Sequence, residues 1–316
     1  MKKVVVTGAL GYLGSKLVEH LLDSFPEMEI FAIDDLSSGN PDVLASKKKF
    51  RRVELVQASI LNLELPLYFK RADAVFHLAA ITDPSSSFEN ADQVFRVNTE
   101  GTQWVGEACA HTKSFLVFPS TTSVYAKQDG IISEDDADKW LDPQTPYAQS
   151  KLKAEQILHK IAAVSDLKYS ILRFGTLFGV SRGMHFRTAV QKFCCEAVQT
   201  GRVTVWESAL DQIRPYCDIQ DAVRAMIFCV QGKNLEWRMA HAASEHATPR
   251  QLVKFLKVFF PRLEIQTVKH PAMNDFFYEV SCDRLKTAGF KFKGSLQRGM
   301  EEVINFLSSE KDTTPS

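Results

Sequence analysis

A tyrosine and a lysine four residues apart are the side chains of this sequence best suited to moving a proton. In Tyr147-Ala148-Gln149-Ser150-Lys151, a helix would place the phenol and the ammonium one turn apart on the same face. The lysine charge favours phenolate, so we expect the phenol pKa to fall from about 10 toward the range of a general base. Tyr12 and Lys16 have the same spacing. Position in the fold must therefore separate a functional pair from an ordinary surface pair.

A hydroxyl-rich stretch is the second chemical feature. Pro119-Ser120-Thr121-Thr122-Ser123-Val124-Tyr125 follows an apolar run that ends near Phe118. If that run is a parallel strand, its carboxyl end lies where ligands bind in open sheets. A hydroxyl there would hydrogen-bond a reacting oxygen and steady it as charge moves. A loop without chemistry is the alternative, because serine and threonine are common in turns.

Glycines near the start of the chain form the third feature. Thr7-Gly8-Ala9-Leu10-Gly11-Tyr12-Leu13-Gly14 has the form GxxGxxG, in which backbone N–H groups at a helix start can meet a pyrophosphate. Asp34-Asp35 comes twenty residues after Gly14, the offset of a carboxylate that binds an adenosine ribose. Such a carboxylate would repel a 2′-phosphate, so the pattern favours NAD over NADP. A tight turn without a ligand is the alternative for both motifs.

The elements that position these motifs alternate between short β-rich runs and longer helical patterns. Strands are predicted at 3–7, 30–33, 53–57, 74–78, 115–119 and 169–174. Helices are predicted at 13–22, 97–111 and 147–164. Strands separated by helices indicate an α/β fold, a Rossmann-type doubly wound parallel sheet covered on both faces.

Beyond Gly179 this alternation breaks down, which indicates a smaller mixed α/β substrate lobe. Helices are predicted at 188–200, from near Asp218 and at 249–259, with a strand at 203–206. We assign an NAD-binding Rossmann domain to 1–175, with a later return of the chain at about 215–240. The substrate-binding lobe is assigned to 176–214 and 241–308, and a frayed tail to 309–316.

Composition favours a small-molecule ligand. The chain has 316 residues, and 38 Lys and Arg balance 38 Asp and Glu, so no overall field attracts nucleic acid or an anionic membrane. No apolar stretch approaches the roughly 18 residues needed to cross a bilayer. The six cysteines lack metal-ligand spacing, so we predict no metal site, reduced and mostly buried thiols, and a cytoplasmic protein.

Taken in order, these motifs resemble the NAD-dependent epimerase/dehydratase branch of the extended short-chain dehydrogenases, in particular its nucleotide-sugar 4-epimerases. The resemblance runs over nearly the whole chain. Its marks are Gly8 to Gly14, His77-Leu78-Ala79-Ala80, Val97 to Thr102, Thr121 to Tyr125, Pro146 to Lys151, Leu172 to Gly179 and Arg214 to Asp221.

The resemblance implies roles for individual residues. Thr121 would be the catalytic threonine, Tyr147 the base and Lys151 its partner. The substrate would meet Thr121, Thr176 and Arg214, the last gripping a nucleotide diphosphate. NAD would meet Gly8, Gly11, Tyr12, Leu13, Gly14, Asp34, Asp35, Ser59, Ile60, Ala79, Ala80, Asn98, Tyr147 and Lys151. Ser59 stands where the family usually has Asp, and Thr176 where 4-epimerases tend to carry Asn.

Three polar residues also have structural interpretations. We interpret His77 as a buried histidine with satisfied hydrogen bonds at a strand end. Arg214 is alternatively a surface partner of Asp211 or Asp218. Asn98 is alternatively a helix cap or a tie to a strand.

The resemblance implies C4 inversion by transient oxidation to a keto-sugar, with a homodimer formed by the helices near 95–112 and 147–163. Dehydratases of the family carry an acid directly after the catalytic threonine, whereas this chain has Thr122-Ser123, so dehydration is disfavoured. A dehydratase, decarboxylase or reductase, including a steroid- or flavonol-type reductase, stays an alternative. A non-catalytic NAD-sensing regulatory protein is the alternative of another class.

Overall fold

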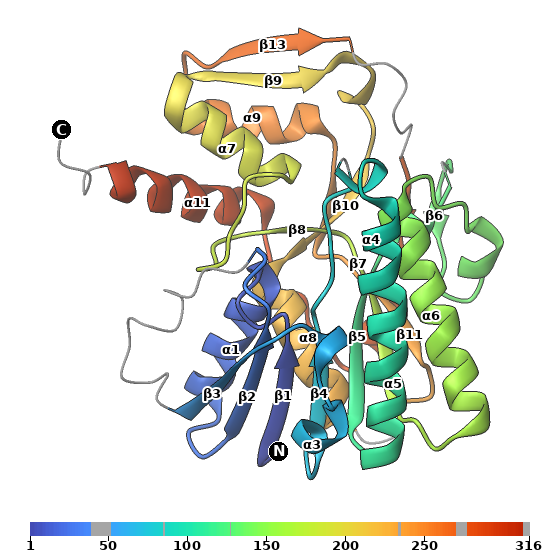
Figure 1. Cartoon of the computed structure of the whole chain (residues 1–316). Coiled ribbons are helices and arrows are strands. Elements are labelled where there is room, and N and C mark those ends of the chain that lie inside the picture. The colour runs from blue at the N-terminus through green and yellow to red at the C-terminus, as the bar shows by residue number, and fades with distance from the viewer. Residues whose placement is uncertain (39–51, 85, 127, 233–234, 270–276, 312–316) are drawn as a thin grey trace.

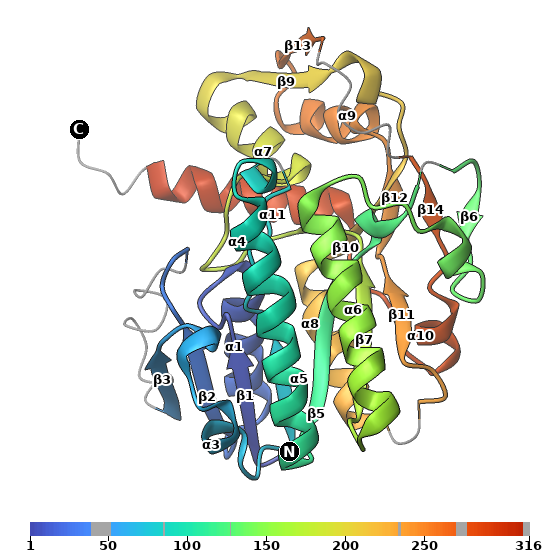
Figure 2. The ribbon, with the colours of Figure 1, turned by 45° about the vertical axis from the view of Figure 1, so that its right-hand side comes forward.

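The computed structural model describes the chain except at residues 39–51, 85, 127, 233–234, 270–276 and 312–316. A seven-stranded sheet fills one half of the molecule and a smaller mixed lobe lies beyond one of its ends (Figures 1 and 2). The sheet order is β11-β7-β5-β4-β1-β2-β3, and every pair in it is parallel. The α/β fold predicted from the sequence is therefore confirmed.

The strands of this sheet match the predicted runs closely. They are β1 (Lys3–Thr7), β2 (Glu29–Asp34), β3 (Val53–Gln57), β4 (Ala74–His77), β5 (Phe115–Thr121), β7 (Tyr169–Phe174) and β11 (Met239–Ala242). β4 and β7 are buried along their whole length, as expected of strands covered on both faces. β11 was not predicted, because it is short and joins β7 only after the chain has left the sheet and returned.

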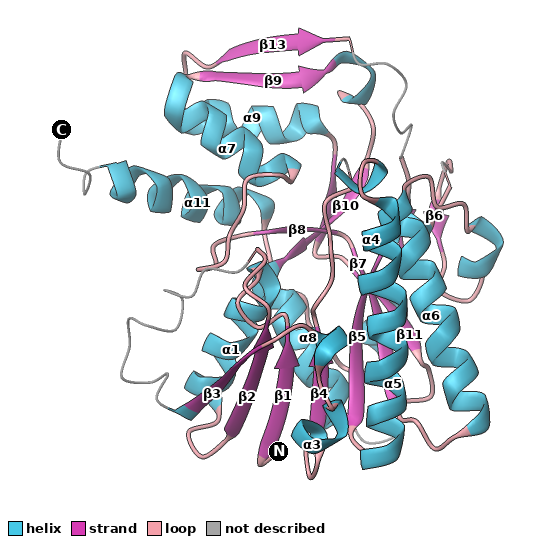
Figure 3. Cartoon of the chain, viewed as in Figure 1, coloured by secondary structure: helices cyan, strands magenta, loops and turns pink. Residues whose placement is uncertain are grey.

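Helices cover both faces of the sheet (Figure 3). One face packs against α1 (Tyr12–Ser24) and α8 (Ile219–Gln231) through a core of aliphatic side chains. The other face packs against α3 (Leu65–Phe69), α5 (Gly101–Thr112) and α6 (Pro146–Val164). α4 (Ala91–Phe95) leads into α5 through a π-helical turn, η4 (Arg96–Glu100), so the helix predicted at 97–111 begins earlier than expected.

The smaller lobe has its own apolar core. Its helices are α7 (Ala189–Thr200), α9 (Pro249–Phe259) and α11 (Leu296–Lys311). Its sheets are β8 (Thr176–Phe178), β10 (Arg214–Asp218) and β12 (Glu245–Ala247) in the order β12-β10-β8, and the pair β9 (Arg202–Trp206) and β13 (Glu264–Val268). A further small pair joins β6 (Ile131–Ile132) to β14 (Glu279–Val280), which is followed by α10 (Asp283–Thr287).

The carboxyl-terminal tail differs from expectation. α11 continues to Lys311, so the first three residues of the tail predicted from 309 are helical, and 312–316 lie outside the described residues. The apolar face of this helix packs into the lobe core through Met300, Val303 and Leu307, which holds the helix together. Within the described part of the chain, no helix is long and apolar enough to span a membrane. The six cysteines are free thiols, five of them buried.

Candidate active site

The carboxyl ends of the central strands bring the predicted residues to one edge of the sheet. In the strand register Thr7 lies between Ile33 on β2 and His77 on β4, and Thr121 at the end of β5 lies beside Phe174 on β7. The glycine turn follows β1 directly, and Asp34 ends β2. This edge is where ligands bind in open parallel sheets.

The glycine turn is packed so tightly that Gly8 and Gly14 have no room for a side chain. Gly8 has a positive φ of 66°, and a Cβ there would lie 2.5 Å from the backbone nitrogen of Ala79. A Cβ on Gly14 would lie 2.1 Å from the carbonyl oxygen of Gly8. α1 begins at Tyr12, and its N-cap residue Gly11 has no side chain with which to cap the first N–H groups. These N–H groups and the positive end of the helix dipole suit an anion.

Asp34 is tied into this turn by the backbone. Its buried carboxylate accepts hydrogen bonds at 2.9 Å from the N–H of Leu10 and of Leu36. Each carboxylate oxygen keeps a second lone pair, so the group can also accept from a ligand hydroxyl. Asp35 is exposed, and its carboxylate accepts from the N–H of Ser37 at 3.0 Å, as in a local turn.

The other small residues expected to contact NAD follow β3 and β4. Ser59 caps a short 3₁₀ helix, η2 (Ile60–Asn62), with its hydroxyl accepting from the N–H of Leu61 at 3.3 Å. Ile60 is buried against Gly101, where a Cβ would lie 2.5 Å from its terminal methyl group. Ala79 and Ala80 follow β4 and are half-buried.

The tyrosine predicted as a base touches the hydroxyl cluster. α6 begins with Pro146, after an N-cap threonine, so Tyr147 lies in its first turn. The Thr121 hydroxyl lies near the Tyr147 phenol and accepts from the N–H of Ser123 at 3.1 Å. Burial raises the pKa of Tyr147 to about 12, and the interaction with Thr121 only partly opposes this.

The expectation that Lys151 lowers the pKa of this phenol is wrong for this structure. The Lys151 ammonium donates to the carbonyl oxygen of Pro119 at 2.8 Å and lies 4.5 Å from the centre of the Phe118 ring. Burial lowers the pKa of Lys151 to about 8, against the opposing charge of Glu155. Burial of each group therefore outweighs any attraction between them, which residue spacing alone does not reveal.

Two of the predicted polar residues have structural partners. Asn98 is buried, exchanges hydrogen bonds of 2.8 and 2.9 Å with the backbone of Ile81, and donates to the Ser150 hydroxyl at 2.9 Å. It therefore ties the segment after β4 to α6. His77 has both ring nitrogens bonded, to Thr7 at 2.9 Å and to Thr102 at 3.1 Å. Burial lowers its pKa to about 3, which confirms the interpretation of a satisfied, neutral histidine.

Two of the residues predicted to meet the substrate, Thr176 and Arg214, lie on the small sheet beyond the strand ends. Thr176 begins β8 and pairs in register with Tyr216, two residues after Arg214 on β10. The Arg214 guanidinium donates to the Gln212 side chain at 3.1 Å. Asp211, one proposed surface partner, instead pairs with Arg250 at 2.6 Å.

Two contacts near Thr121 and the glycine turn were not predicted from the sequence. The Tyr278 hydroxyl donates to Thr122 at 3.3 Å, directly after Thr121. Gly183 packs on the glycine turn, where a Cβ would lie 2.5 Å from the carbonyl oxygen of Gly11. Both contacts join segments far apart in the chain, so no local pattern announces them. Across the described residues, no cluster of side chains suited to a metal ion is found.

The sequence matches known proteins over most of its length. Residues 4–237 match the model of the NAD dependent epimerase/dehydratase family. A Bacillus subtilis (strain 168) protein named as an uncharacterized UDP-glucose epimerase, YtcB, is 31% identical over 238 residues, which cover 73% of each chain. The UDP-glucose 4-epimerase of Mycolicibacterium smegmatis is 29% identical over 229 residues, 71% of this chain and 72% of that one.

Solved structures share the fold. The UDP-glucose 4-epimerase of Thermotoga maritima with UDP-glucose superposes with a TM-score of 0.87 at 22% identity, over 98% of this chain and 99% of that one. The UDP-glucuronic acid 4-epimerase of Bacillus cereus, in complex with UDP-glucuronic acid and NAD, gives 0.86 at 22% identity, with the same coverage. The family match spans well over half of the sequence, and this chain therefore belongs to the NAD dependent epimerase/dehydratase family.

Proposed function

We propose that this chain is a nucleotide-sugar epimerase that inverts C4 through a transient keto-sugar. The observation that carries the proposal is that the Tyr147 phenol lies near the Thr121 hydroxyl at the sheet edge, with Lys151 one turn further along α6. One relative named as an uncharacterized UDP-glucose epimerase and one named as a UDP-glucose 4-epimerase support a UDP-hexose as substrate. Thr121, Thr176 and Arg214 are the residues that we propose to contact it.

The residues of the glycine turn fit NAD, the cofactor of the family. Gly8 and Gly14 leave the backbone bare where a pyrophosphate must approach, and the first N–H groups of α1 would bind that anion. Asp34 would accept from the adenosine ribose while still holding Leu10. When bound, NAD supplies the acceptor that takes a hydride from the sugar carbon and later returns it.

Tyr147 is the group that we propose takes the proton of the sugar hydroxyl. A pKa of about 12 leaves the phenol protonated near neutral pH, so the phenolate must be stabilised during the reaction. The Thr121 hydroxyl would donate to that phenolate or to the sugar oxygen, because it lies near the phenol. Lys151, with a pKa of about 8, carries a positive charge near neutral pH and would donate to a ribose hydroxyl.

The absence of an acid after Thr121 favours epimerisation over water elimination. Thr122 and Ser123 occupy the two positions after it, and the Thr122 hydroxyl is bonded to Tyr278. A hydroxyl is too weak an acid near neutral pH to protonate a leaving hydroxide. C4 inversion needs no such acid.

The test combines identification of the cofactor with a substrate assay. The purified protein is denatured to identify the released dinucleotide, and the native protein is incubated with UDP-glucose and with UDP-galactose. We expect NAD, interconversion of the two sugars, and no accumulation of NADH. Tyr147→Phe should lower kcat by about 10²- to 10⁴-fold while NAD stays bound.

Tyr68→Phe is the matched control, because this half-buried phenol lies on α3, close to the amino end of β4. It should leave the turnover rate unchanged. Steady production of NADH would make the protein a dehydrogenase, and released NADP would contradict the assignment of Asp34. If Tyr147→Phe keeps the protein's function in the cell, the alternative of a non-catalytic NAD-sensing protein is favoured.

A further inference from the structure

A buried ion pair lies one helical turn beyond Lys151. Glu155 on α6 is 1% exposed and Arg173 on β7 is 3% exposed. The Arg173 Nε donates to Glu155 Oε1 at 3.0 Å, and a terminal guanidinium nitrogen donates to Oε2 at 2.6 Å. This two-point geometry is the strong form of an arginine–carboxylate contact, and it fixes the relative orientation of the two side chains.

The pair is joined to the strand that carries Thr121. The Ser120 hydroxyl donates to Glu155 Oε1, so the residue before Thr121 is bonded to the carboxylate. On the other side, Arg173 donates to the Tyr125 hydroxyl at 2.7 Å. The same charged pair therefore holds both ends of the hydroxyl-rich stretch.

The rest of this network is neutral and satisfied. The His241 Nδ1 lies 2.8 Å from the carbonyl oxygen of Ser281 and must donate to it, so Nε2 accepts from the Tyr125 hydroxyl. Burial lowers the pKa of His241 to about 3 and raises that of Tyr125, so neither carries a charge near neutral pH. Arg173 is paired with the buried carboxylate of Glu155, and its guanidinium also lies 3.7 Å from the exposed carboxylate of Asp138.

Tyr147, Lys151 and Glu155 follow one another at four-residue intervals, on one face of α6. Fixing Glu155 to β5 and β7 therefore fixes the rotation and the axial position of the other two side chains. We propose that Glu155, clamped by Arg173, is a positioning residue that sets Tyr147 against Thr121 and holds Lys151 in place for the reaction.

Energetics favour a positional role over a stabilising one. A buried ion pair is weak evidence for stability, because desolvation of two charges offsets most of their attraction and well-packed apolar residues often do as well. Position matters more in a reacting site, where a displacement of about 1 Å costs on the order of 10²-fold in rate. A bidentate pair bonded to the neighbour of Thr121 meets that need.

Glu155 also acts on the charge of Lys151. The groups that face Lys151 are Tyr147 and Glu155 on its own helix, neutral His77 on β4, and the Phe118 ring and Pro119 carbonyl on β5. Of the two influences on the pKa of Lys151, burial lowers it and the Glu155 charge raises it. Removing that charge should therefore lower the pKa of Lys151 below about 8.

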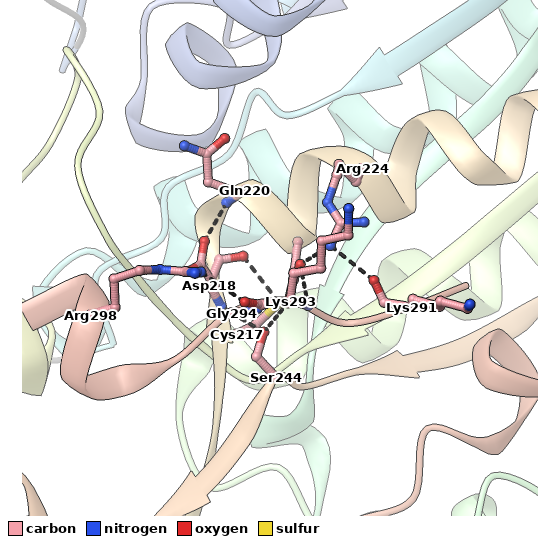
Figure 4. Close-up of polar contacts among 10 residues, drawn as sticks. Cys217, Asp218, Gln220, Arg224, Ser244, Lys291, Lys293, Gly294 and Arg298 are labelled. Atoms are coloured by element: carbon pink, nitrogen blue, oxygen red, sulfur yellow. Dashed lines mark hydrogen bonds and ion pairs between the residues drawn. The ribbon is translucent and has the colours of Figure 1, made fainter. Parts of the chain in front are cut away.

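A second buried carboxylate provides the matched control, and Figure 4 labels its partners Arg224, Ser244 and Gly294. Asp221 on α8 is 1% exposed and accepts from the N–H of Gly294 at 2.7 Å, from the Ser244 hydroxyl at 2.8 Å and from the Arg224 guanidinium. It resembles Glu155 in burial and in its arginine partner. It anchors the segment before α11 rather than the helix that carries Tyr147.

The experiment compares Glu155→Gln with Asp221→Asn in the full chain, and its turnover measurements rest on the proposed epimerase function. For Glu155→Gln we expect bound NAD, a nearly unchanged KM and a kcat lower by about 10²-fold. The alkaline limb of its kcat profile should move to lower pH. Asp221→Asn should lose stability but keep the kcat and the pH profile of the unmodified protein. Equal kinetic effects of the two substitutions, or an unchanged Glu155→Gln, would overturn the proposal.

Two further measurements separate this proposal from folding and from the proposed reaction. If Glu155→Gln does not fold, Ser120→Ala removes one hydrogen bond to Glu155 and should still lower kcat, by about tenfold; an unchanged kcat overturns the proposal. Nuclear magnetic resonance titration of labelled lysine side chains, with Lys151→Met to assign the signal, reports the Lys151 pKa without turnover. A lower pKa in Glu155→Gln supports the proposal even if no sugar is epimerised, and an equal pKa contradicts it.

Discussion

The glycine turn and helix α6 reach the same edge of the sheet, but they are held there by different kinds of atoms. At the turn the contacts are between backbones: Gly8 lies against Ala79, and Gly183 lies against Gly11, at distances that leave no room for a Cβ. Asp34 adds a carboxylate, but it too bonds to backbone N–H groups.

At α6 the contacts are between side chains. Glu155 is bonded to Arg173 and Ser120, and Asn98 donates to the Ser150 hydroxyl on the same helix. The two regions should therefore fail in opposite ways. Adding atoms should disrupt the packing of the turn, whereas removing polar atoms or charge should displace α6.

The largest effect on stability is expected from an added methyl group at the turn. In Gly14→Ala the new Cβ would lie 2.1 Å from the carbonyl oxygen of Gly8. Alanine favours a helix over glycine by about 1 kcal/mol, but overpacking against a fixed backbone costs up to about 3 kcal/mol, so a net loss is expected. Urea unfolding curves measure the change.

Gly11→Ala is the control for this experiment. Its Cβ would lie 3.5 Å from the same carbonyl oxygen, in ordinary contact, and Gly11 has a negative φ. It should change the free energy of unfolding by less than about 1 kcal/mol. Equal losses in the two variants would mean that crowding is not what limits the turn.

The same difference explains what the sequence allowed us to predict. Turn glycines, apolar strands and the four-residue spacing of Tyr147 and Lys151 are local patterns, and the structure has β1, β3 and β7 at the predicted residues. Glu155 and Arg173 are 18 residues apart on different elements, and the contact of Tyr278 with Thr122 spans 156 residues, so no period reveals them.

The burial of side chains was the other property that residue spacing did not predict. The phenol of Tyr147 and the ammonium of Lys151 were expected to stabilise each other's charge. Instead burial disfavours the charged form of both, raising the pKa of the phenol and lowering that of the ammonium. Roles for Arg214 and Thr176 depend in the same way on a bound substrate and stay predictions.

Lowering the pH by one unit is expected to have a smaller effect through each buried histidine, and each region contributes one such residue. His77 lies next to the turn and His241 lies in the network, and each has a pKa lowered from 6.5 to about 3 by burial. Unfolding restores the ordinary pKa, so the unfolded chain binds more protons between these values. Stability is therefore complete above about pH 6.5 and falls as the pH falls toward 3, by up to about 1.4 kcal/mol per pH unit for each histidine.

Urea unfolding at a series of pH values tests this expectation. His77→Gln and His241→Gln should each reduce the slope of stability against pH by a similar amount. The exposed His111 is the control, and His111→Gln should leave that slope unchanged. A slope that responds to one buried histidine alone would show that the other region takes up its proton without unfolding.

The smallest effect on the free energy of unfolding is expected when a polar atom is removed from the turn. The Tyr12 hydroxyl donates to the carbonyl oxygen of Gly179 at 2.7 Å and accepts from the buried Gln191 amide, which links the turn to the lobe. Tyr12→Phe keeps the ring and leaves these partners unbonded, at a cost of about 1 kcal/mol in urea unfolding. If this substitution destabilises the protein more than Gly14→Ala, the turn depends on side-chain bonds as α6 does, and the contrast between the two regions is wrong.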